Sequence, residues 1–323
     1  MKIIFNRSSE EYEWCWSNSL GNLLLELPQE DDGLCLCYGA KTLTFDENYY
    51  KDLKKKYSKI AFLDFSQSSF FLDPNFDQKF KKLKLFSHSF TNNQHTVTAF
   101  KNTLNFKNVS YIKVGFPIKE KKYNKFINMS SKSKKFDLIY SGGIYSKFHF
   151  DMLKIMKDFK YIFSSFYKQN FFGKFTWNPF FRIKQNRFED HNKIIELQSQ
   201  TKAAICNFEN YIPDNYDKRF KNIKEKFNFR DTIPELKGRF FELAATKTLM
   251  IVKKDKWNII EEYFVPNEDF IYFTTIDELK EKIFDITQNY ENYWPLVESA
   301  YNKIISNSPE IMIKNIKKTL LNN

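Results

Sequence analysis

The sequence predicts an α/β protein with two Rossmann-like domains that face a cleft and a C-terminal helical segment that braces both. Three observations support this prediction. Apolar stretches of strand length alternate with amphipathic stretches of helix length, which is typical of parallel sheets covered by helices. The 323 residues exceed one ordinary core and fit two domains. A polar segment at 115–135 holds a proline and a Ser/Lys run, and it separates two such series.

The first predicted domain covers residues 1–120. It opens with the strand "MKIIF" and the helix "WSNSLGNLLLEL". The stretches "GLCLCYG" and "KIAFLDF" predict buried strands with the helix "ENYYKDLKKKY" between them, and "KLKLFSHSF" and "VSYIKVGF" are weaker strand candidates. We expect several of these strands to end at polar tips, at Asp64, Ser87 and His88, as in one Rossmann-like half.

The second predicted domain covers residues 121–323. It begins with the strand "FDLIYSGG" and the helix "SKFHFDMLKIMKDF". Further strands are predicted at "KYIFSSF", "AAICNF", "TLMIV" and "DFIYF", with helices near 189–199, 236–246 and 276–288. The terminal stretch "NYWPLVESAYNKIISNSPEIMIKNIKKTLLNN" is helical in this interpretation and folds back over both halves.

The formal charge of +12 raises the alternative of a nucleic-acid-binding protein. Its best support is the stretch 167–188, "YKQNFFGKFTWNPFFRIKQNRF", in which aromatic and cationic residues alternate. The same stretch also suits a sugar platform or a packed hairpin. Most of the basic residues are lysines mixed with Asp and Glu, as on solvated helix faces. Arginine is scarce, and five of the six arginines fall between 182 and 239.

The cysteines and the hydropathy indicate a cytoplasmic protein. No stretch reaches ~18 uninterrupted apolar residues, the length that predicts a transmembrane helix, and the N-terminal apolar run is too short for a signal peptide. Cys35 and Cys37 share one face of a strand, so they do not easily bridge each other. Cys15 and Cys206 are isolated, and no spacing predicts zinc or another cofactor.

A double glycine follows the first strand of the second domain in "IYSGGIYSKFHF". Gly142 and Gly143 would let the backbone approach a ligand, and Tyr145 and the helix start follow directly. The segment matches neither a dinucleotide fingerprint nor a P-loop, so a plain tight turn is the alternative.

Polar residues also follow the strand "AAICNF". Asn207 and Glu209 come at its carboxyl end, where open α/β sheets bind ligands. A capped strand end would explain the same residues. The remaining histidines, His95, His149 and His191, show no ligand spacing and are interpreted as ordinary polar residues.

The stretch "IPELKGRFFELAATKTLMIVKKDKWN" places three charged residues at the start of an apolar element. If a helix starts near Leu236, Arg239 and Glu242 share one face, and Lys237 precedes them. An arginine suits phosphate and a carboxylate suits the vicinal hydroxyls of a sugar. The alternative is a surface Arg–Glu ion pair that contributes less than ~1 kcal/mol.

From about 138 to 300 the sequence resembles the second domain of GT-B glycosyltransferases, in particular the spore-coat, CgeB-like group. The resemblance rests on "LKGRFFELAATKTLMIVKKD", "IIEEYFVPNEDFIYFTTIDELKEKI" and "DLIYSGG". It makes Glu242 the second glutamate of a Glu-x7-Glu pattern, which grips the nucleotide ribose. The chain departs from the pattern at Glu235, which lies one residue too close. It also has no glycine near Thr246 or Lys247, where the family usually has one.

The resemblance implies an enzyme that transfers a sugar from a nucleotide sugar to a glycan, lipid or protein, with peripheral membrane contact as an option. No Asp-x-Asp motif is present, so we expect no metal requirement. The first domain would bind the acceptor, and Asp64 and His88 are the candidates for a catalytic base; a retaining enzyme would need none. A catalytically inactive binding protein of the same fold is the nearest alternative.

Overall fold

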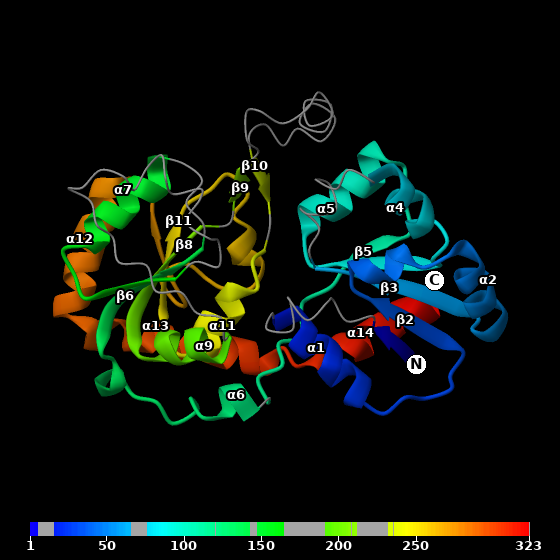
Figure 1. Cartoon of the computed structure of the whole chain (residues 1–323), viewed down its shortest axis with the longest axis horizontal. Coiled ribbons are helices and arrows are strands. Elements are labelled where there is room, and N and C mark those ends of the chain that lie inside the picture. The colour runs from blue at the N-terminus through cyan, green and yellow to red at the C-terminus, as the bar shows by residue number, and fades with distance from the viewer. Residues whose placement is uncertain are drawn as a thin grey trace. The chain divides into compact units, whose positions relative to one another are not determined.

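The computed structural model of the chain describes residues 1–5, 16–65, 76–119, 121–142, 147–164, 191–207, 209–211, 232–234 and 236–322. These residues form an α/β fold with two parallel sheets, as predicted (Figure 1). The chain divides into two compact units. Unit 1 comprises Met1–Pro117, Phe208–Lys237 and Asn307–Asn323, and unit 2 comprises Ile118–Asn207 and Gly238–Ser306.

The predicted domains, 1–120 and 121–323, are continuous, whereas unit 1 also takes in Phe208–Lys237 and the C-terminal Asn307–Asn323. The terminal stretch predicted as one bracing segment forms two helices, α13 (Tyr290–Ser306) and α14 (Pro309–Asn322). The first belongs to unit 2 and the second to unit 1, so the chain leaves unit 2 before α14 begins. Pro309 is the first residue of α14. Proline suits this position because the first N–H groups of a helix have no partner within the helix.

Unit 1 is built on a sheet of five parallel strands. The strands are β1 (Lys2–Phe5), β2 (Leu34–Tyr38), β3 (Lys59–Leu63), β4 (His88–Thr91) and β5 (Val109–Tyr111), and the helices are α1 (Trp16–Glu26), α2 (Glu47–Lys56), α4 (Phe76–Leu83), α5 (Gln94–Thr98) and α14, with short helical turns η2 (Ala40–Thr44) and η3 (Ala99–Thr103). Their order in the sheet, β1-β2-β3-β4-β5, follows the sequence. A two-stranded ribbon, β9 (Glu209–Tyr211) with β10 (Thr232–Pro234), is also grouped with this unit.

The local sequence explains why these elements form. β2 is apolar and buried along its whole length, as expected for a strand covered on both faces. Its thiols, Cys35 and Cys37, are free and buried, in agreement with the sequence, whereas Cys15 lies outside the described residues. Asp46 starts α2 because its side chain accepts a hydrogen bond from the N–H of Asn48 at 2.7 Å.

Unit 2 is built on a second sheet of five parallel strands. The strands are β6 (Phe136–Ser141), β7 (Tyr161–Ser164), β8 (Thr201–Cys206), β11 (Leu249–Lys253) and β12 (Ile271–Phe273), and the helices are α6 (Lys121–Asn124), α7 (Lys147–Met156), α9 (His191–Ser199), α11 (Arg239–Ala245), α12 (Ile276–Gln288) and α13, with turns η4 (Ser131–Ser133) and η6 (Ile259–Glu262). Their order is β12-β11-β8-β6-β7. The chain therefore starts inside the sheet at β6, moves to one edge at β7 and returns past β6 to β8.

Helices cover both faces of the unit 2 sheet. In Figure 1, α7 and α12 lie on one side of the sheet and α9 and α11 on the other. The core on the first side is apolar and almost fully buried, with Leu138, Met152, Ile251 and Leu279 among its members. Burial of such side chains is the main stabilising contribution to a sheet covered by helices.

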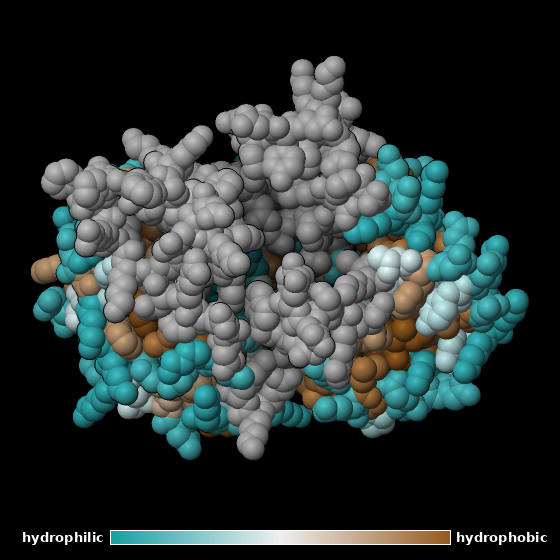
Figure 2. Space-filling view, in the orientation of Figure 1, coloured by the Kyte–Doolittle hydropathy of each residue, from teal (hydrophilic) through white to brown (hydrophobic). Residues whose placement is uncertain are grey.

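The surface that can be followed in Figure 2 is hydrophilic around the rim of each unit, with hydrophobic residues visible further in. Within the described residues, no helix combines the length and the apolar character that crossing a bilayer requires.

Candidate functional site

The strand order of unit 2 reverses direction at the neighbouring strands β6 and β8. In open parallel sheets, ligands bind where successive connections leave a strand in opposite directions along the sheet. That reversal occurs between β6 and β8, which are neighbours although β7 comes between them in the sequence. Gly142 directly follows β6 and Asn207 directly follows β8. Two of the predicted donor-binding residues therefore lie at this switch point.

Gly142 and Arg239 are brought together from separate elements. A Cβ added to Gly142 would lie 3.1 Å from Nη1 of Arg239 and 3.1 Å from the hydroxyl of Tyr140. These approaches are tighter than ordinary van der Waals contact, so a side chain at position 142 would push against the guanidinium. The glycine therefore leaves room for a half-buried cation beside the end of β6.

Two serine hydroxyls lie at the same sheet edge. Ser141 ends β6 and Ser164 ends β7, and the two residues are paired in register. Both are buried, and neither hydroxyl has a hydrogen-bond partner among the described residues. Gly142 donates its N–H to the carbonyl of Ser164 at 2.9 Å, which fixes the loop start. Sequence reasoning missed these serines, although each stood at the polar end of a predicted strand.

The helix α11 is shorter than predicted and carries a buried carboxylate. It begins at Arg239 rather than near Leu236, and every residue from Phe240 to Ala245 is buried. Oε1 of Glu242 lies 2.8 Å from Nε2 of His191, and both side chains are 8% exposed. The alternative of a surface Arg–Glu ion pair is therefore wrong, because Glu242 is buried and its recorded ion pair is with His191.

A second histidine contacts a predicted site residue. Nδ2 of Asn207 lies 3.2 Å from Nε2 of His149, which comes from α7. Both residues are buried. The amide can only donate through Nδ2, so Nε2 of His149 accepts and the ring proton is on the other nitrogen. The sequence suggested that His149 and His191 are ordinary polar residues. In the structure each lies within hydrogen-bond distance of a residue predicted to contact the ligand, Asn207 and Glu242 respectively.

The remaining predicted donor-binding residues are less fully placed. Lys237 is half-buried and ends the stretch that is grouped with unit 1. Glu209 starts β9 and pairs through its backbone with Pro234, while its side chain lies outside the described residues. Gly143 and Tyr145 also lie outside the described residues.

In unit 1 the two candidate bases lie at different positions relative to their strands. Asp64 directly follows β3 and is buried. The sequence predicted that His88 ends a strand, but His88 is the first residue of β4. Its Nε2 lies 2.9 Å from the hydroxyl of Ser110. Burial and the charge of Lys101 lower the pKa of His88 to about 4, so the ring is neutral and a weak base.

Other polar side chains accompany Asp64 at the carboxyl edge of the unit 1 sheet. Thr91 ends β4 and Asn92 follows it, and both are buried. Oγ1 of Thr91 and Nδ2 of Asn92 have no hydrogen-bond partner among the described residues. Asp64 donates its backbone N–H to the carbonyl of Phe90 at 3.4 Å, which ties the ends of β3 and β4 together. The sequence did not single out Thr91 and Asn92, because β4 was only a weak strand candidate.

Comparison with solved structures identifies the fold. Anabaena HepE in complex with UDP-glucose is 12% identical, with a TM-score of 0.58 and full coverage of both chains. A trehalose-phosphate synthase (UDP-forming) from Burkholderia vietnamiensis is 10% identical over 98% of this chain and 79% of its own, with a TM-score of 0.53. The fold is that of a GT-B glycosyltransferase. No curated protein matches the sequence.

The GT-B similarity extends to a larger enzyme and to a sequence family. Staphylococcus aureus TarM, as a mutant in complex with UDP and two sugars, is 12% identical over 92% of this chain, with a TM-score of 0.56; the chain spans 57% of that protein. Residues 153–307, just under half of the chain, match the family described as Glycosyl transferase-like. This segment includes Asn207, Arg239 and Glu242.

Lys247 lies in the short connection between α11 and β11, near which the resemblance would place a glycine. Its φ is +51°, a left-handed conformation that glycine adopts more readily. The ammonium of Lys247 is buried and donates to the carbonyl of Ile127 at 2.8 Å and to Glu298 at 2.9 Å. These contacts offset the backbone strain and hold the C-terminal end of α11 in place.

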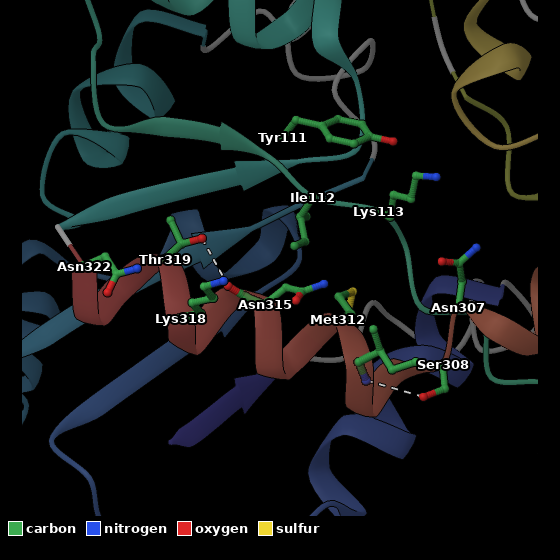
Figure 3. A pocket seen from close by; sticks show the side chains of 11 residues that line it. Tyr111, Ile112, Lys113, Asn307, Ser308, Met312, Asn315, Lys318, Thr319 and Asn322 are labelled. Carbon is green, nitrogen blue, oxygen red and sulfur yellow. Dashed lines mark hydrogen bonds between the residues drawn. The ribbon is translucent and has the colours of Figure 1, made fainter.

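A pocket of about 460 Å³ lies within unit 1, between the end of β5 and α14 (Figure 3). Two lysines, Lys113 and Lys318, and several amides line it. None of the predicted site residues is among its lining residues. Within the part of the chain that the structure describes, no group of three or more His, Cys, Asp or Glu residues could hold a metal ion.

Proposed function

We propose that the chain is a glycosyltransferase that moves a sugar from a uridine-diphosphate donor to a hydroxyl of a glycan, lipid or protein, without a metal. The observation that carries this proposal is the approach of Arg239 to Gly142 at the end of β6, with the buried Glu242 three residues further along α11. The GT-B fold and the UDP and UDP-glucose bound to structures of HepE support the choice of donor.

The diphosphate is assigned to the end of β6. Arg239 supplies a guanidinium next to Gly142, where the missing Cβ leaves space for a phosphate to approach. The hydroxyls of Ser141 and Ser164, which have no hydrogen-bond partner among the described residues, can donate to phosphate oxygens at the same edge. As the bond between the sugar and the diphosphate breaks, negative charge grows on the leaving group, and a fixed cation stabilises that charge.

The ribose is assigned to Glu242. A carboxylate accepts hydrogen bonds from two vicinal hydroxyls, and this one is the only charged group that lies inside the buried face of α11. Because Glu242 is buried, each of these hydrogen bonds is electrostatically stronger than it would be at the surface.

The acceptor is assigned to unit 1. Asp64, Thr91 and Asn92 provide a carboxylate, a hydroxyl and an amide at one sheet edge, which suits a ligand with several hydroxyls. In an inverting reaction Asp64 would take the proton of the acceptor hydroxyl as its oxygen attacks the anomeric carbon and the diphosphate leaves. His88 is a poor candidate for this role because it is neutral and bonded to Ser110.

The test is calorimetry with UDP. We expect wild type to bind UDP and Glu242→Ala to weaken binding by about 1–3 kcal/mol, as expected when a charged hydrogen-bond partner is lost. Glu196→Gln is the matched control, because Glu196 lies in the same unit with its side chain 42% exposed, and its described partners, Lys193 and Gln200, are close to it in the sequence. Hydrolysis of UDP-glucose by wild type would separate an enzyme from an inactive binding protein.

A salt series separates the nucleic-acid alternative. Binding to a polyanion falls by orders of magnitude between low and moderate salt, whereas a nucleotide with two phosphates depends less on salt. Tight RNA binding at physiological salt, with no binding of UDP or any other nucleoside diphosphate, would overturn the proposed function. Membership in the CgeB-like group and a cytoplasmic location are parts of the same proposal, and the reduced cysteines support the latter.

A further inference from the structure

His191 is the first residue of α9, and it reaches across to α11. Its Nε2 lies 2.8 Å from Oε1 of Glu242. The His191 and Glu242 side chains are each 8% exposed, so the contact is shielded from bulk water. A carboxylate taken out of water without a hydrogen-bond partner is strongly disfavoured. The histidine therefore makes the buried position of Glu242 tolerable.

Among the described residues, the rest of α11 offers little else to fix the orientation of Glu242. The other buried residues of α11 are Phe240, Phe241, Leu243, Ala244 and Ala245, none of which has a polar side chain. Arg239, one turn earlier, is directed towards Gly142 instead. A glutamate has three rotatable side-chain bonds, and the hydrogen bond from α9 selects among its rotamers.

We propose that His191 is a positioning residue for the donor site. It donates from Nε2 to Oε1 of Glu242 and so presents the second oxygen, Oε2, to the ribose hydroxyls. The proposal rests on the assignment of Glu242 to the ribose. A carboxylate that is oriented before the ligand arrives loses less conformational entropy on binding, which raises affinity.

To position Glu242, residue 191 needs a hydrogen-bond donor at the place of Nε2, but it does not need a positive charge. A neutral ring with its proton on Nε2 and an imidazolium both donate there. Glutamine carries an amide nitrogen at about the same distance from Cβ, so it can replace this donor. Asparagine is too short to reach Glu242, and leucine has no donor. This difference between similar side chains gives a graded test.

The experiment measures UDP affinity by calorimetry for His191→Gln, His191→Asn and His191→Leu. We expect the Gln variant to stay within about threefold of wild type, and the Asn and Leu variants to bind about tenfold more weakly or worse. His95→Leu is the control, since His95 lies in unit 1 and has no assigned role. Thermal unfolding of each variant shows whether it is folded, and the Asn variant keeps the test valid if the Leu variant does not fold.

A double-variant measurement excludes a purely structural role. In a Glu242→Gln background the carboxylate is already lost, so adding His191→Leu should lower UDP affinity no further. Equal losses for the Gln and Leu variants, or a full additional loss in the Glu242→Gln background, would overturn the positioning role while leaving the donor site intact. Absence of UDP binding in wild type would instead overturn the assignment of the donor site, and the positioning role with it.

Discussion

The two sheets of the molecule contain the same number of parallel strands but differ in strand order. In unit 1 the order follows the sequence from β1 to β5, whereas in unit 2 it reverses between β6 and β8. In open parallel sheets ligands bind at the carboxyl ends of the strands where the order reverses, and a sequential order has no such point. Similar alternations of strands and helices in the sequence therefore produce different sheet topologies, and only unit 2 has the reversal at which we propose the nucleotide binds.

The two units also differ in why a glycine is needed directly after a strand. Gly39 follows β2 and Gly142 follows β6, and each donates its N–H to the carbonyl that ends a neighbouring strand, of Leu63 and Ser164 respectively. A Cβ on Gly39 would meet only a ring carbon of Phe5, at 3.8 Å, but the φ of +89° disfavours any side chain. Gly39 is thus needed for its backbone conformation, whereas Gly142, whose φ of +155° also disfavours a side chain, is needed in addition for the space beside Arg239.

The largest effect is expected for Arg239→Ala. Removing the cation beside the leaving diphosphate should lower kcat/KM for the sugar donor by about 100-fold, the usual scale for a lost electrostatic group in a transition state. Thermal stability should change little because the side chain is half-buried and is not part of the apolar core. Steady-state kinetics with UDP-glucose would measure the effect.

The matched control for Arg239→Ala is Lys113→Ala, which removes a cation from the unit 1 pocket. We expect this change to leave donor kinetics unaltered. If both variants lost activity equally, a diffuse positive field rather than a localised phosphate site would attract the donor, and the contrast between the units would fail.

The next effect compares the two glycines. Gly142→Ala should weaken UDP binding about tenfold, because the new methyl group displaces Nη1 of Arg239. Gly39→Ala should instead destabilise the fold by about 1–2 kcal/mol, the cost of a left-handed conformation for an L-residue. UDP affinity of the Gly39 variant should equal that of wild type. Calorimetry and thermal unfolding of the two variants would show whether these effects separate.

Most of the elements could be predicted because buried strands are encoded locally. Stretches such as "GLCLCYG" and "TLMIV" are apolar throughout, and they form β2 and β11 as expected. His88 was misplaced because the apolar stretch before it is not part of the strand, which covers only His88–Thr91. Strand order could not be predicted, since no local pattern states which strands are neighbours.

The candidate site was predictable only where residues are close in the sequence. Arg239 and Glu242 stand three apart, so helical spacing was enough to group them. The contact between Asn207 and His149 joins residues that are 58 positions apart. Such a contact depends on tertiary packing, and a single sequence with one isolated histidine gives no signal for it. The partner of Glu242 was missed for the same reason.

The third prediction concerns buried ionisable groups, which titrate in different pH ranges in the two units. In unit 2, Lys134 donates to the carbonyls of Ser199 at 2.8 Å and Lys247 at 2.5 Å. Burial and the charge of Lys247 nevertheless lower the pKa of Lys134 from 10.5 to about 7. The unfolded chain then binds more protons in this range, so unit 2 should lose stability as the pH falls from about 10 to 7.

In unit 1 the corresponding group is His88. Its pKa is lowered from 6.5 to about 4, so unit 1 should lose stability only as the pH falls through that lower range. Thermal unfolding measured from pH 4 to pH 10 would test both ranges. Lys134→Met should reduce the difference in stability between pH 7 and pH 10. His88→Gln should reduce the difference in stability between pH 4 and pH 6.5. A Lys134→Met variant with an unchanged slope above pH 7 would contradict this assignment.

The smallest effect is expected from removing divalent cations. No Asp-x-Asp motif occurs in the sequence, and in unit 2 the half-buried guanidinium of Arg239 already lies beside the proposed diphosphate position. A cation supplied by the protein stabilises the leaving group without a metal bridge. Turnover of UDP-glucose should therefore stay within about twofold of its initial value in excess EDTA, whereas Arg239→Ala lowers it by about 100-fold. If EDTA abolished turnover and magnesium or manganese restored it, the charge on the diphosphate would be neutralised mainly by the metal. Arg239 would then be reduced to a contact that helps to hold the donor.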